Sequence, residues 1–301
     1  MRTLCFGEAI VDLICRRPIS SLAEADAFLP SLGGVTANVA VTAARHGASV
    51  ALAGGAGDDR WGEWVRDRLA AEGIDLTWFG RAVDHTTSLA VVTVDERGEP
   101  SWQLYGEGIA ATIEALDGQL LEAVEATDAL VLTSNTLSTK PAAKLTMAAR
   151  ERALELGRPI VFDPNVRLHR WARNPGRAGR TALDCVPGAF LVKCNQAEAR
   201  LMTGEIDPEA AAAALLAAGA QHVIVTRGVS GAMLRAKSMR LDVRARPAAT
   251  LRSTVGAGDV FLGVLIARLG QTDYYPSALG ASLPEAVEEA ARACERWGAL
   301  E

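Results

Sequence analysis

Ser253-Thr254-Val255-Gly256-Ala257-Gly258-Asp259-Val260-Phe261-Leu262-Gly263 is the stretch of this chain that says most about its fold. A glycine-rich turn runs into an apolar helical segment, whose first turn carries one aspartate. Glycines let backbone N–H groups close on an anion, and the free N–H groups at a helix amino terminus attract it further. Gly256, Ala257 and Gly258 are therefore predicted to stabilise charge on a phosphoryl group. Asp259, beside them, is placed to accept a proton from an attacking hydroxyl.

Short apolar runs alternate with helically periodic segments along the rest of the chain. The apolar runs predict strands at 3–7, 49–53, 129–133, 159–163, 189–194 and 222–226. The periodic segments predict helices at about 36–46, 61–73, 113–126, 139–156, 195–203, 208–219, 256–269 and 284–297. Strands that are apolar on both faces and alternate with helices are typical of a doubly wound, mostly parallel α/β sheet. Ligands bind beyond the carboxyl ends of the strands in such sheets.

Composition and charge narrow the function classes. The 301 residues are 49% hydrophobic and 22% charged, as in a soluble globular protein. The net charge is −5 and no Lys/Arg stripe is present, which argues against nucleic acid as a partner. The five cysteines are scattered and read as reduced thiols in a cytoplasmic protein. Polar residues interrupt the amino-terminal apolar run, and no run of about 18 apolar residues occurs, so neither a signal peptide nor a membrane span is expected.

Further motifs accompany the glycine-rich turn. In chain order they are Gly7-Glu8 with Asp12, Gly33-Gly34 with Asn38, Gly54-Gly55 with Gly57-Asp58 and Gly62, Asp163-Pro164-Asn165 with Arg167, Asn195 with Glu198, and Thr226-Arg227-Gly228 with Gly231. With this series the chain resembles the ribokinase-like (PfkB) family of carbohydrate kinases, from residue 3 to about 299. The resemblance implies one ribokinase-like domain over residues 1–301, with a small β-sheet lid from segments at about 10–32 and 84–108. It also implies an ATP-dependent sugar kinase that phosphorylates a primary hydroxyl.

The sugar side of the predicted site lies near the amino-terminal motifs and the lid. A carboxylate such as Asp12 can accept two hydroxyl hydrogen bonds. The resemblance implies further sugar contacts from Gly33, Gly34, Asn38, Tyr105, Asn165 and Arg167. Arg167 has three readings: it steadies the γ-phosphate, binds an acidic substrate group, or pairs with Asp163. Trp102 on the lid either packs against the body or covers the substrate.

The nucleotide side follows later strands. The resemblance implies that Asn195 and Glu198 hold Mg²⁺ through water, although the same pair also reads as a helix start. Thr226, Gly228 and Gly231 are expected to line the nucleotide together with Asn195, Gly256 and Gly258. A plain turn between two strands is the alternative for the Gly-x-x-Gly segment. ATP and Mg²⁺ are thus the expected cofactors, and a homodimer through the lid is the expected assembly.

Two departures from the family pattern bear on activity. Ser253 stands where relatives carry an aspartate that helps to bind an activating monovalent cation, and the chain stops shortly after Gly298-Ala299, where relatives commonly continue. We therefore expect activity that is cation-independent or weak.

The substrate is predicted from the lid and the Asp163 motif, which look most like fructokinases and 2-keto-3-deoxygluconate kinases. Acid-specific members tend to carry arginine after the lid tyrosine, and Gly106 stands there instead. A neutral sugar, fructose first, is therefore favoured over 2-keto-3-deoxygluconate, ribose or a nucleoside. A non-catalytic sugar or nucleotide sensor of the same fold is the alternative from another class. A dehydrogenase is a poor fit, because no Gly-x-Gly-x-x-Gly follows the first strand.

Overall fold

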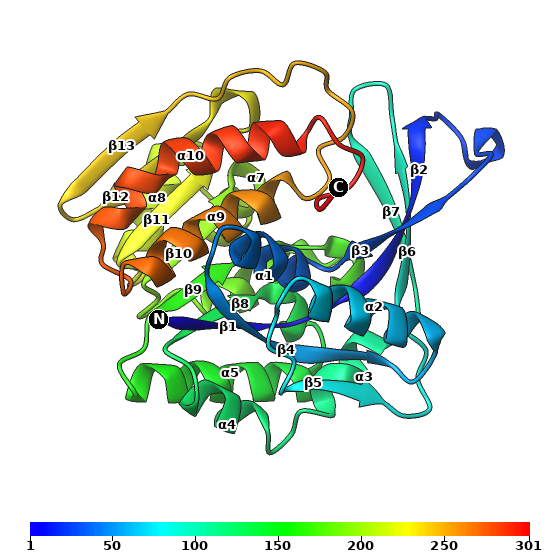
Figure 1. Cartoon of the computed structure of the whole chain (residues 1–301). Coiled ribbons are helices and arrows are strands. Elements are labelled where there is room, and N and C mark those ends of the chain that lie inside the picture. The colour runs from blue at the N-terminus through cyan, green and yellow to red at the C-terminus, as the bar shows by residue number, and fades with distance from the viewer. Residues whose placement is uncertain (107) are drawn as a thin grey trace.

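Two sheets organise the chain in the computed structural model, which describes residues 1–106 and 108–301 (Figure 1). The larger has nine strands in the order β13-β12-β11-β10-β9-β8-β1-β4-β5. These are β1 (Arg2–Phe6), β4 (Ser49–Gly57), β5 (Phe79–Ala82), β8 (Ala129–Thr133), β9 (Ile160–Asp163), β10 (Leu191–Asn195), β11 (His222–Thr226), β12 (Ala232–Ala236) and β13 (Met239–Val243). Neighbours from β5 to β11 run parallel, and β12 and β13 add an antiparallel hairpin at one edge. The predicted doubly wound, mostly parallel sheet is confirmed.

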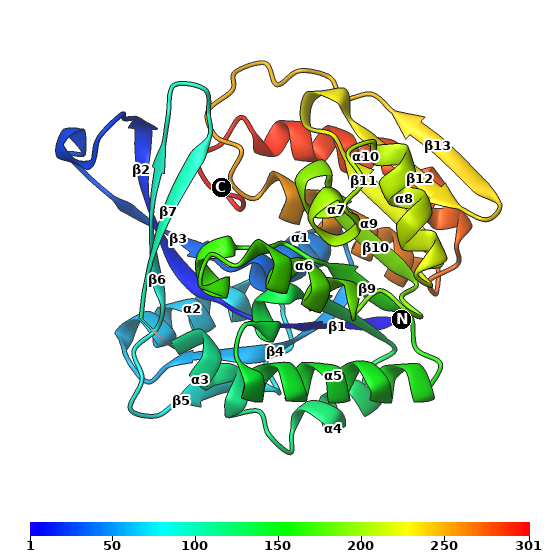
Figure 2. The same ribbon diagram turned by 180° about the vertical axis from the view of Figure 1, so that it is seen from behind.

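Helices cover both faces of this sheet, as Figures 1 and 2 show from opposite sides. One face carries α1 (Val35–Arg45), α2 (Arg60–Ala71), α9 (Ala257–Gln271) and α10 (Ser277–Ala293). The other carries α3 (Gly108–Glu114), α4 (Leu120–Glu125), α5 (Lys140–Glu155), α6 (Pro175–Leu183), α7 (Gln196–Thr203) and α8 (Pro208–Ala217). Successive strand residues feed alternate cores, since Cys5 packs in the first and Leu4 and Phe6 in the second. This explains why the strands are apolar throughout.

The smaller sheet is the predicted lid. It has the order β3-β2-β6-β7, formed by β2 (Ile10–Pro18), β3 (Leu29–Gly33), β6 (Leu89–Val94) and β7 (Pro100–Tyr105). Its inner side packs Ile14 and Val92 with Val255, the residue before the glycine turn. The lid is therefore fixed against the start of α9. The predicted lid segments 10–32 and 84–108 contain these strands except for Gly33, the last residue of β3, and position 107 lies outside the described residues.

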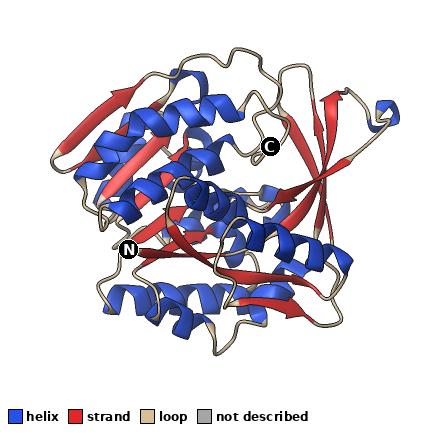
Figure 3. Cartoon of the chain, viewed as in Figure 1, coloured by secondary structure: helices blue, strands red, loops and turns tan. Residues whose placement is uncertain are grey.

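Some predicted elements differ from the observed ones, which Figure 3 colours by type. The predicted helix at 113–126 is two helices, α3 and α4, separated by a turn in which Gly118 has a φ of 86°. The predicted helix at 284–297 begins earlier, at Ser277, and contains Pro284 in its interior. Proline usually marks a first helical turn, which explains the misplaced start. Helix α6 and strands β5, β12 and β13 were not predicted.

The described residues also contain four short 3₁₀ turns: η1 (Leu22–Glu24), η2 (Ser134–Leu137), η3 (Leu168–Trp171) and η4 (Gly228–Ser230). At the carboxyl edge of the sheet, η2 directly follows β8, and η3 follows β9 after residues 164–167. Within the described residues, every helix is too short or too polar to cross a membrane.

Candidate active site

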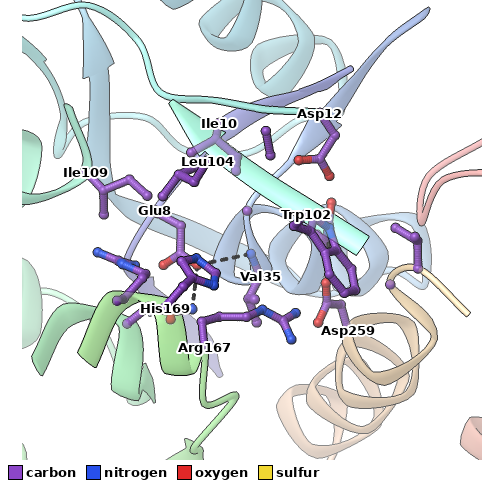
Figure 4. A pocket seen from close by; sticks show the side chains of 17 residues that line it. Glu8, Ile10, Asp12, Val35, Trp102, Leu104, Ile109, Arg167, His169 and Asp259 are labelled. Carbon is purple, nitrogen blue, oxygen red and sulfur yellow. Dashed lines mark hydrogen bonds between the residues drawn. The ribbon is translucent and has the colours of Figure 1, made fainter. Parts of the chain in front are cut away.

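A pocket lies between the lid and the carboxyl edge of the large sheet (Figure 4). It is lined by Glu8, Ile10, Asp12, Gly34, Val35, Asn38, Ala90, Trp102, Leu104, Ile109, Asn135, Arg167, His169, Arg170, Val255, Gly256 and Asp259. These residues come from segments as far apart in sequence as β1 and α9. The pocket brings together much of the predicted sugar site and the catalytic turn.

The start of α9 forms one wall of this pocket, and its backbone is suited to binding an anion. Gly256 is the N-cap and has a φ of 72°, in the left-handed region that favours glycine. Within the described chain, the backbone N–H groups of Gly256 and Gly258 have no acceptor, and that of Ala257 has only a 3.4 Å contact with the Thr254 carbonyl. These donors are free to bind charge that develops on a transferred phosphoryl group.

Asp259 lies in the first turn of α9 and is almost fully buried, at 5% exposure. The side-chain amide of Asn38 donates to its Oδ2 at 2.9 Å. Burial raises the pKa of Asp259 to about 6, although Asn38 and the positive charges of Arg167 and Lys193 oppose that shift. A helix amino terminus by itself favours the ionised carboxylate, but loss of solvent has the larger effect on the pKa of Asp259. A pKa near 6 suits a group that accepts a proton at neutral pH.

Asp12 is the second buried carboxylate of the pocket, at 6% exposure. Burial and the nearby charge of Asp259 raise the pKa of Asp12 to about 7, against the opposing effect of Arg167. A Cβ on Gly33 would lie 2.4 Å from the Asp12 carboxyl group. Gly33 therefore makes room for Asp12, while Gly34 lines the pocket itself.

The lid contributes aromatic and apolar cover. Trp102 and Leu104 face the pocket, because alternate residues of β7 point to the same side of the sheet. Tyr105 points the other way: it is 54% exposed and donates from its hydroxyl to Gln103. The structure thus leaves Tyr105 outside the pocket and puts Trp102 over the ligand space.

Arg167 faces the pocket and lies over the Trp102 ring, with 4.9 Å from Cζ to the ring centroid. It does not pair with Asp163, whose carboxylate instead accepts a 2.8 Å hydrogen bond from the Lys193 ammonium. Asn165 is buried beside this pair with a φ of 37°, and its side chain is not part of the pocket lining. Of the readings open for Arg167, a ligand-facing position is the one that the geometry supports.

Asn195 and Glu198 form a capping box at the start of α7. The Glu198 carboxylate is buried and accepts from the backbone N–H groups of Asn195, at 2.9 Å, and Val166, at 3.1 Å. Burial and the charge of Asp163 raise the pKa of Glu198. This pair therefore caps the start of the helix, as one of the two predictions had it. The remaining lone pairs of Glu198 can still accept a hydrogen bond from a metal-bound water.

The predicted nucleotide residues follow β10 and β11. Thr226 ends β11, and Gly228 begins η4, which turns the chain into the antiparallel strand β12. A Cβ on Gly231 would lie 1.9 Å from the Val243 carbonyl, so this glycine is needed for the hairpin itself. The Gly-x-x-Gly segment therefore lies at the same edge of the sheet as the glycine-rich turn before α9, and this position fits either a nucleotide-lining loop or a plain turn.

Four polar residues of the pocket were not among the predicted site residues: Asn135, His169, Arg170 and Glu8, although Glu8 belongs to the Gly7-Glu8 motif. Each follows one of the adjacent strands β1, β8 and β9. Apart from the Gly7-Glu8 motif, the signal that could have found them was this position, because polar residues that follow buried parallel strands gather at one edge of the sheet.

Comparisons with known proteins agree with this geometry. The profile of the pfkB family carbohydrate kinases matches residues 2–294. Probable fructokinase-2 of Arabidopsis thaliana is 30% identical over 263 residues, which cover 87% of this chain and 79% of that protein. Fructokinase-1 of Oryza sativa subsp. japonica is 30% identical over 299 residues, covering 98% and 90% of the two chains. The crystal structure of a fructokinase double mutant from Vibrio cholerae, bound to fructose, ADP and potassium, has a TM-score of 0.86 and 29% identity, and covers 99% of this chain and 94% of that one.

Proposed function

The chain belongs to the pfkB family of carbohydrate kinases and is an ATP-dependent sugar kinase, and we propose that fructose is its preferred acceptor, phosphorylated on a primary hydroxyl. For phosphoryl transfer, the observation that carries this proposal is that Asp259, a buried carboxylate able to accept a proton, lies in the same turn as the free N–H groups of Gly256 and Gly258. The relatives named fructokinase and the fructose bound in the Vibrio cholerae enzyme support the choice of sugar.

The transfer follows from the positions of these groups. The primary hydroxyl oxygen attacks the γ-phosphorus, the bond from that phosphorus to the β,γ-bridging oxygen breaks, and ADP leaves. The hydroxyl proton passes to the Asp259 carboxylate, which Asn38 orients by its 2.9 Å hydrogen bond. The N–H groups of the α9 turn stabilise negative charge on the transferred phosphoryl oxygens. Asp12 accepts hydrogen bonds from sugar hydroxyls, and Trp102 excludes water from the lid side of the pocket.

Mg²⁺ would be held from the α7 side, where the Glu198 carboxylate accepts a hydrogen bond from a coordinated water. When bound, the ion neutralises phosphate charge during transfer. Thr226, Gly228 and Gly231 would line the nucleotide, since they follow the strand next to β10 at the same sheet edge.

We expect activity without a monovalent cation. Ser253 is fully buried, and its hydroxyl accepts from the Val255 N–H at 3.1 Å, so this position supports the turn and offers no negative charge. The Vibrio cholerae fructokinase contains potassium. Equal turnover in sodium, potassium and choline buffers is the expected result, and activation by potassium of tenfold or so would contradict it.

We place the enzyme in the cytoplasm as a homodimer joined through the outer face of the lid. A groove on that face is lined by Ile19, Ser20, Ser21, Leu22, Val91, Thr93, Asp95, Glu99, Pro100, Ser101 and Gln103. Neither nucleic acid nor a membrane is expected as a partner. Light scattering after size-exclusion chromatography tests the dimer: a mass near 31.7 kDa, that of one chain, would refute it.

An ADP-release assay with Mg-ATP and a sugar panel tests the proposed function. The panel contains fructose, tagatose, ribose, 2-keto-3-deoxygluconate and a few nucleosides. The expected result is the highest kcat/KM with fructose. Sugar binding without ADP release would instead favour a sensor of the same fold.

A further inference from the structure

The pocket has a second polar end that the transfer step does not use. It is built by Glu8, after β1, by Asn135, in η2 after β8, and by Arg170, in η3 after β9. In Figure 4, Glu8 and His169 lie on one side of the pocket and Asp12 and Asp259 on the other. A sugar whose reacting hydroxyl lies at Asp259 would therefore direct its opposite end toward Glu8, Asn135 and Arg170, called here the distal subsite.

Two buried acceptors of the distal subsite lack a donor. Glu8 is 4% exposed, and its Oε1 accepts from the Asn135 amide at 2.8 Å and from the Val35 N–H at 3.4 Å. Within the described residues, Glu8 Oε2 and Asn135 Oδ1 have no hydrogen-bond partner. The Asn135 amide is oriented by Glu8, because the reversed amide would place two acceptors face to face. Buried acceptors without donors are costly, so this arrangement is suited to a ligand that brings O–H groups.

Arg170 adds donors to the same end. Its only side-chain hydrogen bond in the described chain is a 3.4 Å contact with Ser138 Oγ, and it forms no ion pair there. Loss of solvent lowers the pKa of this guanidinium, and the charge of Glu8 opposes that shift. Five N–H donors on a guanidinium leave several for a ligand. Arg167, by contrast, lies over Trp102 and near the two carboxylates of the transfer end.

We propose that the distal subsite binds the primary hydroxyl at the end of the sugar opposite to the phosphorylated one. A hydroxyl can donate to Glu8 Oε2 or Asn135 Oδ1 while it accepts from Arg170. A carboxylate at that end would have no proton to donate and would face the charge of Glu8, and a methyl group would leave all three groups unpaired. The site therefore selects neutral ketoses that carry a primary hydroxyl at each end, as fructose does at C1 and C6. This inference rests on the proposed function.

The test is a cycle that pairs changes in the sugar with changes in the enzyme. Fructose, 1-deoxyfructose and 6-deoxyfructose are compared by kcat/KM in the wild type and in Arg170→Met. One deoxy sugar lacks the accepting hydroxyl and is not phosphorylated; the other lacks only the distal hydroxyl. In the wild type, kcat/KM for that second sugar is expected to be about 10- to 100-fold below the value for fructose, since a hydrogen bond to a charged group is lost. In Arg170→Met this ratio shrinks by about tenfold, because the partner is already absent.

Matched variants keep the test decisive. Arg173→Met removes an exposed arginine of the same segment and should leave the ratio unchanged. Glu8→Gln replaces an acceptor oxygen with a donor amide and should reduce the ratio as Arg170→Met does, which serves if Arg170→Met folds poorly. A purely structural role would lower kcat/KM for both sugars equally.

The outcomes separate the two proposals. Fructose turnover with the same ratio in the wild type, Arg170→Met and Glu8→Gln overturns the distal subsite and leaves the proposed function intact. Phosphorylation of 2-keto-3-deoxygluconate as efficiently as fructose also overturns the subsite. Failure of the wild type to phosphorylate fructose overturns the proposed function itself.

Discussion

Replacing Asp12 with asparagine is expected to make the protein more stable and a poorer kinase. The Asp12 carboxyl is 6% exposed, crowded by the Gly33 backbone and close to the charge of Asp259. Ionising it in the folded state is therefore unfavourable. The ionised form is useful to the enzyme because it accepts hydrogen bonds from the sugar hydroxyls. Asparagine keeps the shape and removes the charge.

The size of the gain follows from the pKa. Folding raises the pKa of Asp12 from 3.8 to about 7. Each unit corresponds to about 1.4 kcal/mol, so at pH 8 the variant should gain about 4 kcal/mol in free energy of unfolding. At pH 5 the folded carboxyl is already protonated, while the unfolded one is still ionised, and the gain falls to about 2 kcal/mol. The penalty thus grows as the pH rises from 3.8 and levels off above the folded pKa.

Urea denaturation of wild type and Asp12→Asn at pH 5 and pH 8 measures both values. Asp117→Asn is the control, since Asp117 is exposed, and its stability should change by less than about 0.5 kcal/mol. In the kinase assay, Asp12→Asn should raise KM for fructose, because the amide has one neutral acceptor oxygen where the carboxylate has two that share a negative charge. A variant that is less stable than the wild type at pH 8, or whose gain is the same at both pH values, would refute this account of Asp12.

Three further predictions follow from the same geometry. First, kcat/KM should begin to fall near pH 7, where Asp12 becomes protonated, and should fall by at least tenfold per pH unit below the Asp259 pKa of about 6, since the protonated carboxyl cannot accept the hydroxyl proton; a flat profile down to pH 5 would contradict this. Second, Gly256→Ala should lower the free energy of unfolding by about 1–3 kcal/mol and remove most of the activity, because residue 256 has a φ of 72° and the new Cβ would lie 2.1 Å from the Ala299 Cβ. Gly118→Ala is its control, because Gly118 has a similar φ but a Cβ added there would meet nothing within 4 Å; it should lower the free energy of unfolding by less and leave kcat unchanged. Third, Lys193→Met should destabilise the fold by about 3–5 kcal/mol by stranding the buried Asp163, and adding Asp163→Asn should recover part of that loss in thermal melts.

The large sheet was predictable because its strands are buried on both faces. Apolar runs such as 129–133 and 222–226 coincide with β8 and β11, since the parallel sheet needs hydrophobic side chains on each side. Strand β13 lies at the sheet edge, where its half-exposed residues, Met239–Val243, carry little apolar signal. Helix α6 has few apolar residues, yet Asn174 caps it and Pro175 begins it, a start signal that the sequence did offer.

The transfer end of the site was more predictable than the distal end. Gly256, Gly258 and Asp259 lie in one short motif, so their chemistry is local and visible in the sequence. Glu8 and Arg170 line the same pocket only because β1, β8 and β9 are neighbours in the sheet, and no spacing along the chain encodes that proximity. Tyr105 shows the limit of motif reasoning, because the pleat of β7 turns it outward and Trp102 inward.

The most direct test of the central claim, that Asp259 accepts the proton during phosphoryl transfer to a sugar, is the behaviour of Asp259→Asn. ADP release with Mg-ATP and fructose is measured beside calorimetric binding of fructose, in the wild type and in the variant. The account predicts that kcat falls by a factor of about 10² to 10⁴, the usual contribution of a positioned general base, while fructose still binds. Near-normal turnover by Asp259→Asn would contradict it.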